Sequence, residues 1–240
     1  MVIISSLHDY RIEDIHTFNE SLNSVGYTSK KIMIVYECEE SVKKYLKRNG
    51  WIIHQKSLDN IQVVTKRFQD ISDVLKSYDS DEYVLVTDCR DVFFNKNIEL
   101  FNPIDLYIGV DGNYPLKNHT WATKEMIKAY PNEYEVLKDK PHLCAGVIFG
   151  KNKKIITLCK DVFEYTFESE IKEKRSTVDQ MALNVLAYKK YNYSPINNTF
   201  VINLGCTDWN YSNSFYIYHQ HDRFKNFFKY IKKNFNKSIL

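Results

Sequence analysis

Short apolar segments alternate with amphipathic segments along most of the chain, and this alternation constrains the fold more than any other feature. Apolar runs that predict strands cover residues 2–5, 31–36, 51–55, 83–88, 105–112, 143–150, 199–204 and 214–220. Apolar residues at helical spacing predict helices over 12–22, 40–50, 61–75 and 177–190. Buried strands that alternate with helices favour an α/β fold, with a mostly parallel twisted sheet and helices on both faces.

The length and composition of the chain suit one globular domain that covers residues 1–240. The chain has 240 residues, and 44% of them are hydrophobic, which is enough for a sizeable core. The formal net charge is only +3, so the composition gives no reason to expect a nucleic-acid partner. We find no internal repeat and no linker rich in Pro, Gly or Ser.

The cysteines indicate a reducing compartment. There are five of them, with no C-x-x-C pair: Cys38, Cys89, Cys144, Cys159 and Cys206. An odd count without pairing motifs argues against a disulfide framework or a zinc knuckle. The first residues lack the pattern of a secretory signal, and no apolar run reaches the roughly 20 residues of a membrane-spanning helix. We therefore expect a cytoplasmic protein.

Charged residues gather where the predicted strands end. These clusters are His8, Asp9 and Arg11 after the first strand; Asp88, Arg90 and Asp91 after the fourth; Asp111 within 105–112; and His219, His221 and Asp222 at the end of the last. Ligands of open α/β sheets bind beyond the carboxyl ends of the strands. The sequence therefore predicts a binding site at this edge of the sheet.

The segment D-C-R-D at 88–91 indicates a site for a hard divalent cation. Carboxylate oxygens, joined by a later histidine, suit Mg²⁺ or Mn²⁺, and these ions keep positions open for phosphate oxygens. In a regular strand, residues 88 and 90 share a face and Asp91 points the other way. Asp88 and Asp91 can therefore meet one metal only if the chain turns at 89–91. Otherwise Asp88 alone binds, or Arg90 forms a simple ion pair with an acid.

Four segments in order, "VLVTDCRDVFF", "CAGVIFG", "VDQMALN" and "YHQHDR", resemble the small GT-A glycosyltransferases that use nucleotide sugars and a divalent metal, including short enzymes from large DNA viruses and bacteria. The resemblance spans about residues 1–223. It implies a Rossmann-like GT-A fold and transfer of a sugar from a nucleoside diphosphate, which we expect to be UDP, to a glycan hydroxyl.

The resemblance also implies roles for individual residues. The metal ligands would be Asp88, Asp91 and His219, with His221 as the alternative histidine. The base and ribose of the donor would contact Leu7, His8, Asp9 and Arg11, and Arg67 would reach the nucleotide. The donor sugar and the acceptor would contact Ala145, Gly146 and Gln180, with Arg90 near the diphosphate and Asp111 near the acceptor.

The sequence departs from the family pattern at two points. Arg90 stands where the second acid of the metal motif is expected, and Cys144 replaces the usual Asn before Ala145.

Asp179 is the predicted catalytic residue. An inverting transferase needs one carboxylate base to take the proton of the acceptor hydroxyl, and we favour this reaction with Asp179 as that base. In a retaining enzyme Asp179 would orient the sugar instead. A helix N-terminus favours the ionised form of such an acid, and a purely helix-stabilising role stays open.

The segment 223–237 predicts a basic amphipathic helix. Its aromatic and aliphatic residues recur at helical spacing among Lys and Arg. Such a helix packs its apolar stripe on the sheet or lies on an anionic membrane.

Three other functions remain as alternatives. A nucleotidyltransferase of related fold would want a glycine-rich phosphate loop, and "SSLHDYR" contains no glycine. A phosphatase with an aspartyl-phosphate intermediate would want an acid at position 90. A non-catalytic module that binds a sugar or a nucleotide would have the same fold without activity.

Overall fold

We describe the protein from a computed structural model of the 240-residue chain. The described residues are 1–101, 106–173, 178–191, 193–195, 200–204 and 215–235.

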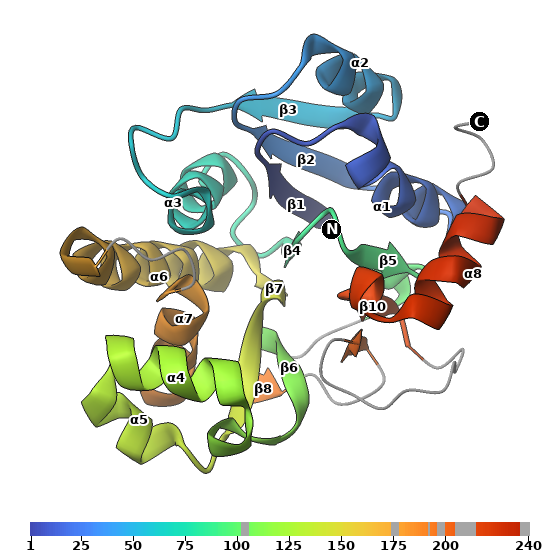
Figure 1. Cartoon of the computed structure of the whole chain (residues 1–240). Helices are drawn as coiled ribbons and strands as arrows, with labels where there is room; N and C mark the ends of the chain where they lie inside the picture. Colours follow the sequence, from blue (N-terminus) through green and yellow to red (C-terminus); the bar gives the residue numbers. More distant parts are fainter. Residues whose placement is uncertain (102–105, 174–177, 192, 196–199, 205–214, 236–240) are drawn as a thin grey trace.

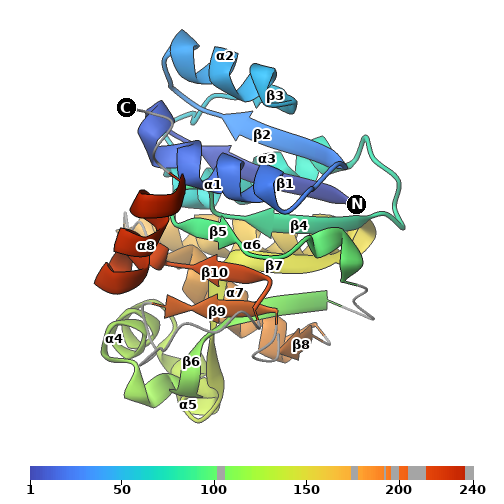
Figure 2. The same ribbon diagram turned by 90° about the vertical axis from the view of Figure 1, so that its right-hand side faces the viewer.

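A seven-stranded mixed sheet forms the centre of the molecule. Its strands are β1 (Val2–Leu7), β2 (Lys30–Val35), β3 (Trp51–Gln55), β4 (Tyr83–Thr87), β6 (Leu106–Pro115), β7 (Pro141–Lys151) and β8 (Tyr193–Pro195). They lie in the order β3-β2-β1-β4-β7-β6-β8, and the stack is visible in Figure 2. All pairs are parallel except those of β7, which runs antiparallel to both β4 and β6. The predicted mostly parallel α/β sheet is confirmed.

Three short strands form a second sheet beside the first. They are β5 (Val92–Phe94), β9 (Val201–Asn203) and β10 (Ile217–His219), and β10 lies between the other two. The strand predicted at 214–220 is thus shorter than expected and lies outside the main sheet. The reason is that the chain turns after β4 and leaves the main sheet, so β5 offers β10 a separate edge.

Apolar side chains cover both faces of the main sheet. Along β1, Val2 and Ile4 join one buried cluster and Ile3 joins the other, as the two-residue repeat of a strand requires. The first cluster lies under α3 (Val63–Leu75), α4 (Thr120–Ala129), α5 (Pro131–Leu137), α6 (Asn152–Glu173) and α7 (Val178–Lys189). The second lies under α1 (Ile12–Ser24), α2 (Glu40–Arg48) and the small sheet. Figure 1 shows α3, α6 and α7 on one side and α1 on the other. Helices therefore cover both faces, as predicted.

The last helix packs on the small sheet. α8 (Lys225–Phe235) covers most of the predicted helix, and residues 236 and 237 lie outside the described residues. Phe227 and Ile231 are buried against Phe93 and Tyr218. For these residues the packing alternative is confirmed. No helix in the described part of the chain is long and apolar enough to cross a membrane.

Candidate active site

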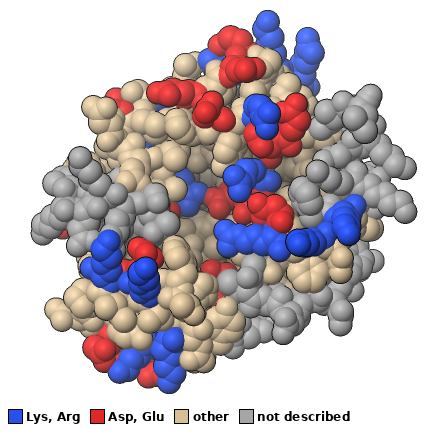
Figure 3. All heavy atoms as spheres, in the orientation of Figure 1, with Lys and Arg blue, Asp and Glu red and all other residues tan. Residues whose placement is uncertain are grey.

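A cavity of about 470 Å³ opens at the carboxyl ends of β1 and β4. Its size is in the range of small-molecule sites. Ten of the predicted site residues line it: Leu7, His8, Arg67, Asp88, Arg90, Asp91, Gly146, Asp179, Gln180 and His219. Figure 3 shows acidic and basic side chains gathered in the hollow near the middle of this face. The binding site predicted at this edge of the sheet therefore has a physical counterpart.

The chain turns at 88–91, as it must if Asp88 and Asp91 are to meet one metal. β4 ends at Thr87, the backbone N–H of Asp88 donates to the carbonyl of Gly146 at 2.9 Å, and β5 begins only at Val92. β10 pairs with β5 so that His219 lies opposite Val92.

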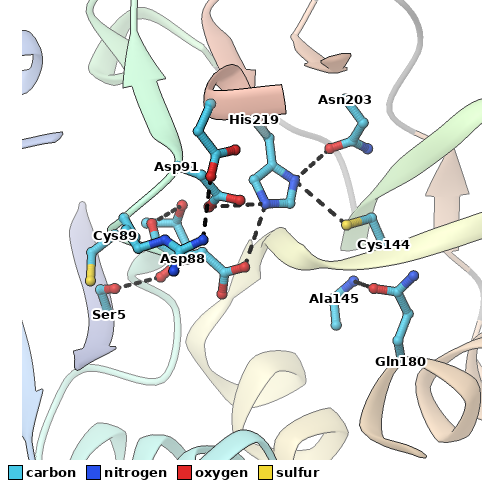
Figure 4. A network of polar contacts seen from close by, with 12 residues as sticks. Ser5, Asp88, Cys89, Asp91, Cys144, Ala145, Gln180, Asn203 and His219 are labelled. Atoms are coloured by element: carbon cyan, nitrogen blue, oxygen red, sulfur yellow. Dashed lines mark hydrogen bonds and ion pairs between the residues drawn. The ribbon is translucent and has the colours of Figure 1, made fainter. Parts of the chain in front are cut away.

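The turn and this pairing bring Asp88, Asp91 and His219 together. His219 Nε2 lies 3.4 Å from Asp88 Oδ2 and 3.5 Å from Asp91 Oδ1 (Figure 4). The candidate ligand atoms of the three residues all lie within 4.8 Å of one another.

The partners of His219 show which of its ring nitrogens carries the proton. Nδ1 lies 2.5 Å from Asn203 Oδ1. The orientation of the Asn203 amide follows from its Nδ2, which donates to the backbone carbonyl of Val110 at 2.7 Å. Asn203 therefore offers an acceptor, and Nδ1 must carry the hydrogen in the neutral ring. The lone pair of Nε2 then points at the two carboxylates. Three acceptor groups that face one another need a cation between them, so these residues fit a divalent metal.

Gly146 provides the space for this arrangement. A Cβ atom at position 146 would lie 2.2 Å from His219 Cε1 and 2.8 Å from Asp88 Oδ2. No other residue type fits here without moving a candidate ligand. The motif "CAGVIFG" thus has a steric reason for its first glycine.

The pKa directions of His219 and Asp88 also indicate a place for a cation between them. Burial alone would lower the pKa of His219, but Cys144, Asp91 and Asp88 around the ring raise that pKa well above its usual value. Burial opposes ionisation of Asp88, yet Arg67 and His219 hold the pKa of that carboxyl well below its usual range. A proton on His219 thus takes the place that a cation would fill.

Arg67 links Asp88, one of the candidate metal ligands, to Asp179, the predicted base. It lies in α3 and is partly buried; its Nη1 contacts Asp88 Oδ1, and its Nη2 donates to Asp179 Oδ2 at 3.1 Å. We predicted a contact between Arg67 and the nucleotide, and the structure gives this side chain two carboxylate partners inside the cavity.

The helix α7 is tied to β7 by two amide side chains four residues apart. Asn184 Oδ1 accepts from the N–H of Leu143 at 2.9 Å, and Asn184 Nδ2 donates to the carbonyl of Leu143 at 2.8 Å. Gln180 Oε1 accepts from the N–H of Ala145 at 3.3 Å (Figure 4). The register of β7 with β6 is irregular here, so these amides bond backbone groups at an interrupted ladder. They hold the start of α7, with Asp179, at the cavity.

Asp179 differs from the expectation for a helix start. It is only 5% exposed, and burial raises its pKa although Arg67 opposes the shift. We expected the helix N-terminus to favour the ionised form, and the desolvation of the carboxyl outweighs that effect.

Four predicted site residues do not line the cavity. Asp9 is exposed at the turn after β1, and Arg11 is the N-terminal cap of α1, where its backbone N–H donates to Asp14 at 2.9 Å. Ala145 faces Gln180, and Asp111 is 3% exposed among histidines.

The structure gives the positions of Arg90 and of the two candidate histidines. Arg90 pairs with Asp222 at 3.3 Å rather than with an acid of its own segment. His219 joins the carboxylates, whereas His221 contacts Asp91 through its backbone N–H.

Several cavity residues were missing from the sequence-based prediction. Tyr10, Val63, Val64, Gln220 and Arg223 line the cavity, and Asn203 supports His219 from β9. Arg223 stands in the quoted segment "YHQHDR", so position in a motif was a usable signal for it. Asn203 lies in an ordinary apolar strand and carried no signal.

No model of a known protein family matches the sequence, and no curated protein matches it either. Solved structures do match. The galactosyltransferase LgtC in complex with donor and acceptor sugar analogs aligns with a TM-score of 0.63 at 13% sequence identity, over 97% of this chain and 96% of that chain. An active-site mutant of LgtC aligns with a TM-score of 0.61, also at 13% identity, over 91% of this chain and 86% of that chain.

These matches cover nearly the whole chain and show that it has the GT-A fold expected from the four segments. At 13% identity the likeness concerns the fold, and the function must be argued from the site.

Proposed function

We propose that this protein is a glycosyltransferase that moves a sugar from a nucleoside diphosphate, in our expectation UDP, to a hydroxyl of a glycan, assisted by Mn²⁺ or Mg²⁺. One observation carries the proposal: Asp88, Asp91 and the lone pair of His219 Nε2 converge in a cavity beyond the strand ends. The likeness to a galactosyltransferase that was solved with donor and acceptor sugar analogs supports it.

The proposed donor lies along the cavity from β1 to α7. Leu7, His8 and Tyr10 line the part next to β1, where the base and ribose would lie. The diphosphate would lie at Asp88 and Asp91, where the metal and Arg90 would offset its charge. A bound divalent cation stabilises the negative charge that grows on the leaving phosphate as the glycosidic bond breaks.

The sugar would lie against Gly146, Asp179 and Gln180, which line the same cavity. We propose Asp179 as the base of an inverting transfer. Its burial favours this role, since a raised pKa makes a carboxylate a better proton acceptor. The anomeric configuration of the first-formed product, read by NMR, tests it: retention would leave Asp179 an orienting residue.

The whole chain would act as one cytoplasmic domain. Four cysteines, Cys38, Cys89, Cys144 and Cys159, are free, and Cys206 lies outside the described residues. Exposed Lys225 and Lys229 on α8 would allow contact with an anionic membrane, which suits an acceptor linked to lipid.

Calorimetry with UDP, GDP and their common sugar conjugates tests the function. We expect one nucleotide to bind in Mn²⁺ and to lose most of its affinity in EDTA. If no nucleotide binds with metal present, the proposed donor site is wrong. If a nucleotide sugar binds but no transfer or hydrolysis follows with any glycan tested, the protein is a binding module.

A further inference from the structure

A second group of metal-type ligands lies next to Gln180, one of the residues that line the cavity. Asp111, His119 and His142 also bring their candidate ligand atoms within 4.8 Å of one another. His142 Nδ1 lies 3.4 Å from Asp111 Oδ2, and His119 Nε2 lies 3.7 Å from the same oxygen. Asp111 and His142 are almost fully buried. One carboxylate and two imidazoles would be a suitable set for Zn²⁺. The hydrogen bonds around the rings decide whether this group can hold one.

The partner of His119 directs a proton toward Asp111. His119 caps α4, and its Nδ1 accepts a hydrogen bond from the backbone N–H of Ala122 at 3.2 Å. A backbone N–H can only donate, so Nδ1 presents a lone pair. In the neutral ring the hydrogen must then lie on Nε2, which faces the carboxylate. A nitrogen that carries a hydrogen cannot bind a metal.

The partner of His142 is the Gln180 amide, which likewise directs a ring hydrogen toward Asp111. The N–H of Ala145 donates to Gln180 Oε1, which fixes the two ends of the amide. Gln180 Nε2 consequently faces His142 Nε2, at 3.1 Å. An amide nitrogen donates, so His142 Nε2 must accept and Nδ1 must carry the hydrogen. This polarity is the reverse of that at His219, where Asn203 offers an acceptor to the remote nitrogen.

We propose that Asp111 and His142 are positioning residues that fix which end of the Gln180 amide faces the substrate, and that this group is not a second metal site. The contacts run in one direction: the Ala145 N–H donates to Gln180 Oε1, Gln180 Nε2 faces His142 Nε2, and His142 Nδ1 faces Asp111 Oδ2 at 3.4 Å, a distance at which the structure shows no hydrogen bond. The substrate in question is the sugar of the proposed function, on which this inference rests, because Gln180 lines the same cavity as Asp179.

The arrangement has a chemical consequence for the cavity. A free amide can rotate by half a turn and exchange its donor and acceptor ends. Here rotation would bring two N–H donors together at Ala145 and two acceptors together at His142, and buried groups without partners are costly. Gln180 therefore presents its remaining N–H and lone pair in a fixed order. Burial also lowers the pKa of His142, which keeps the ring neutral.

The tautomer of His142 is the direct test. The intact protein, labelled with ¹⁵N-histidine, would be studied by long-range ¹H–¹⁵N correlation NMR, which separates the two neutral tautomers and the charged ring. The variant His142→Gln assigns the signals by their loss. We expect a neutral ring with its hydrogen on Nδ1. A hydrogen on Nε2, or a charged ring at neutral pH, would overturn the proposal.

Substitution of Gln180 tests whether its amide sets the position of the hydrogen on His142. In Gln180→Glu a carboxylate faces His142 Nε2 and can only accept, so we expect a proton to appear on Nε2. In the matched control Gln180→Leu no acceptor is added, and the hydrogen should stay on Nδ1. The link between Gln180 and His142 is refuted if the Gln180→Glu variant keeps the wild-type pattern.

Zn²⁺ is the probe for the metal alternative. We expect one equivalent of Zn²⁺ to leave the signals of His119 and His142 unchanged. A shift of both would show a metal site and overturn the inference. None of these readouts needs a nucleotide, a sugar or turnover, so they can fail or succeed independently of the proposed glycosyl transfer.

Discussion

Gly146→Ala tests the geometry of the candidate metal site, because the space at this position can be worked out. The added Cβ would lie 2.2 Å from His219 Cε1, whereas ordinary contact begins at 3.4 Å. The ring or the strand must therefore give by about 1.2 Å, and metal–ligand distances tolerate only about 0.2 Å. Asp88 Oδ2 would be crowded as well, at 2.8 Å.

We expect the Gly146→Ala variant to fold and to lose metal affinity. Overpacking of this kind costs about 1–3 kcal/mol of stability. The affinity for Mn²⁺ should fall roughly tenfold to a hundredfold, as it does when ligands are misplaced. Titration calorimetry measures the affinity, and thermal unfolding in EDTA measures the stability.

Gly150→Ala is the matched control on the same strand. Its Cβ would lie 3.1 Å from Leu106 Cδ1, the end of a flexible side chain, and it touches none of the candidate ligands. It should cost some stability and leave Mn²⁺ affinity unchanged. Equal Mn²⁺ affinity in Gly146→Ala and the wild type would refute the reasoning.

Four further predictions concern the same cluster. Asp88→Asn and Asp91→Asn should each weaken Mn²⁺ binding in calorimetry, and an unaffected variant would remove that acid from the ligand set. Arg67→Gln removes the cationic partner of the buried Asp179, whereas the part-exposed Asp88 keeps His219. An unpaired buried carboxyl costs about 1–3 kcal/mol, so Tm in EDTA should fall by roughly 2–12 °C; an unchanged Tm would contradict the ion-pair network. The pKa of His219 is raised in the folded protein. The proton on its ring therefore stabilises the fold fully below the pKa of the unfolded state, and this stabilisation is lost as pH rises through the pKa of the folded state. Mn²⁺ must displace this proton, so the increase in Tm on adding Mn²⁺ should grow as pH rises toward the folded pKa of His219 and level off above it; a constant increase would count against this competition. Asn203→Leu removes the acceptor that orients the ring, so Mn²⁺ affinity should drop roughly tenfold or more in calorimetry, and unchanged affinity would show that the ring needs no such partner.

The fold and the edge that carries the cavity could be predicted because both follow from local pattern. Strand runs and helix spacing appear within short windows, and the segments after β1 and β4 lie at the same edge because those two strands pair in parallel. The turn at 88–91 was recognised as a condition, since two acids three residues apart need one. His219 was the better histidine because it ends β10, whereas His221 lies beyond it.

Contacts between distant segments could not be predicted. Arg67 is 112 residues from Asp179, and no local pattern joins them. Asp111 lies beside His142 because of where β6 and β7 pair, and it does not line the cavity. Arg11 resembled a ligand residue in sequence but caps α1 instead.

The central claim is that a divalent cation binds between Asp88, Asp91 and His219. The most direct measurement is an anomalous diffraction map of crystals grown with Mn²⁺ and UDP. The account predicts a peak in contact with both carboxylates and His219 Nε2, and none at Asp111, His119 and His142. A peak at the latter group, or no peak at the former with the nucleotide bound, would contradict it.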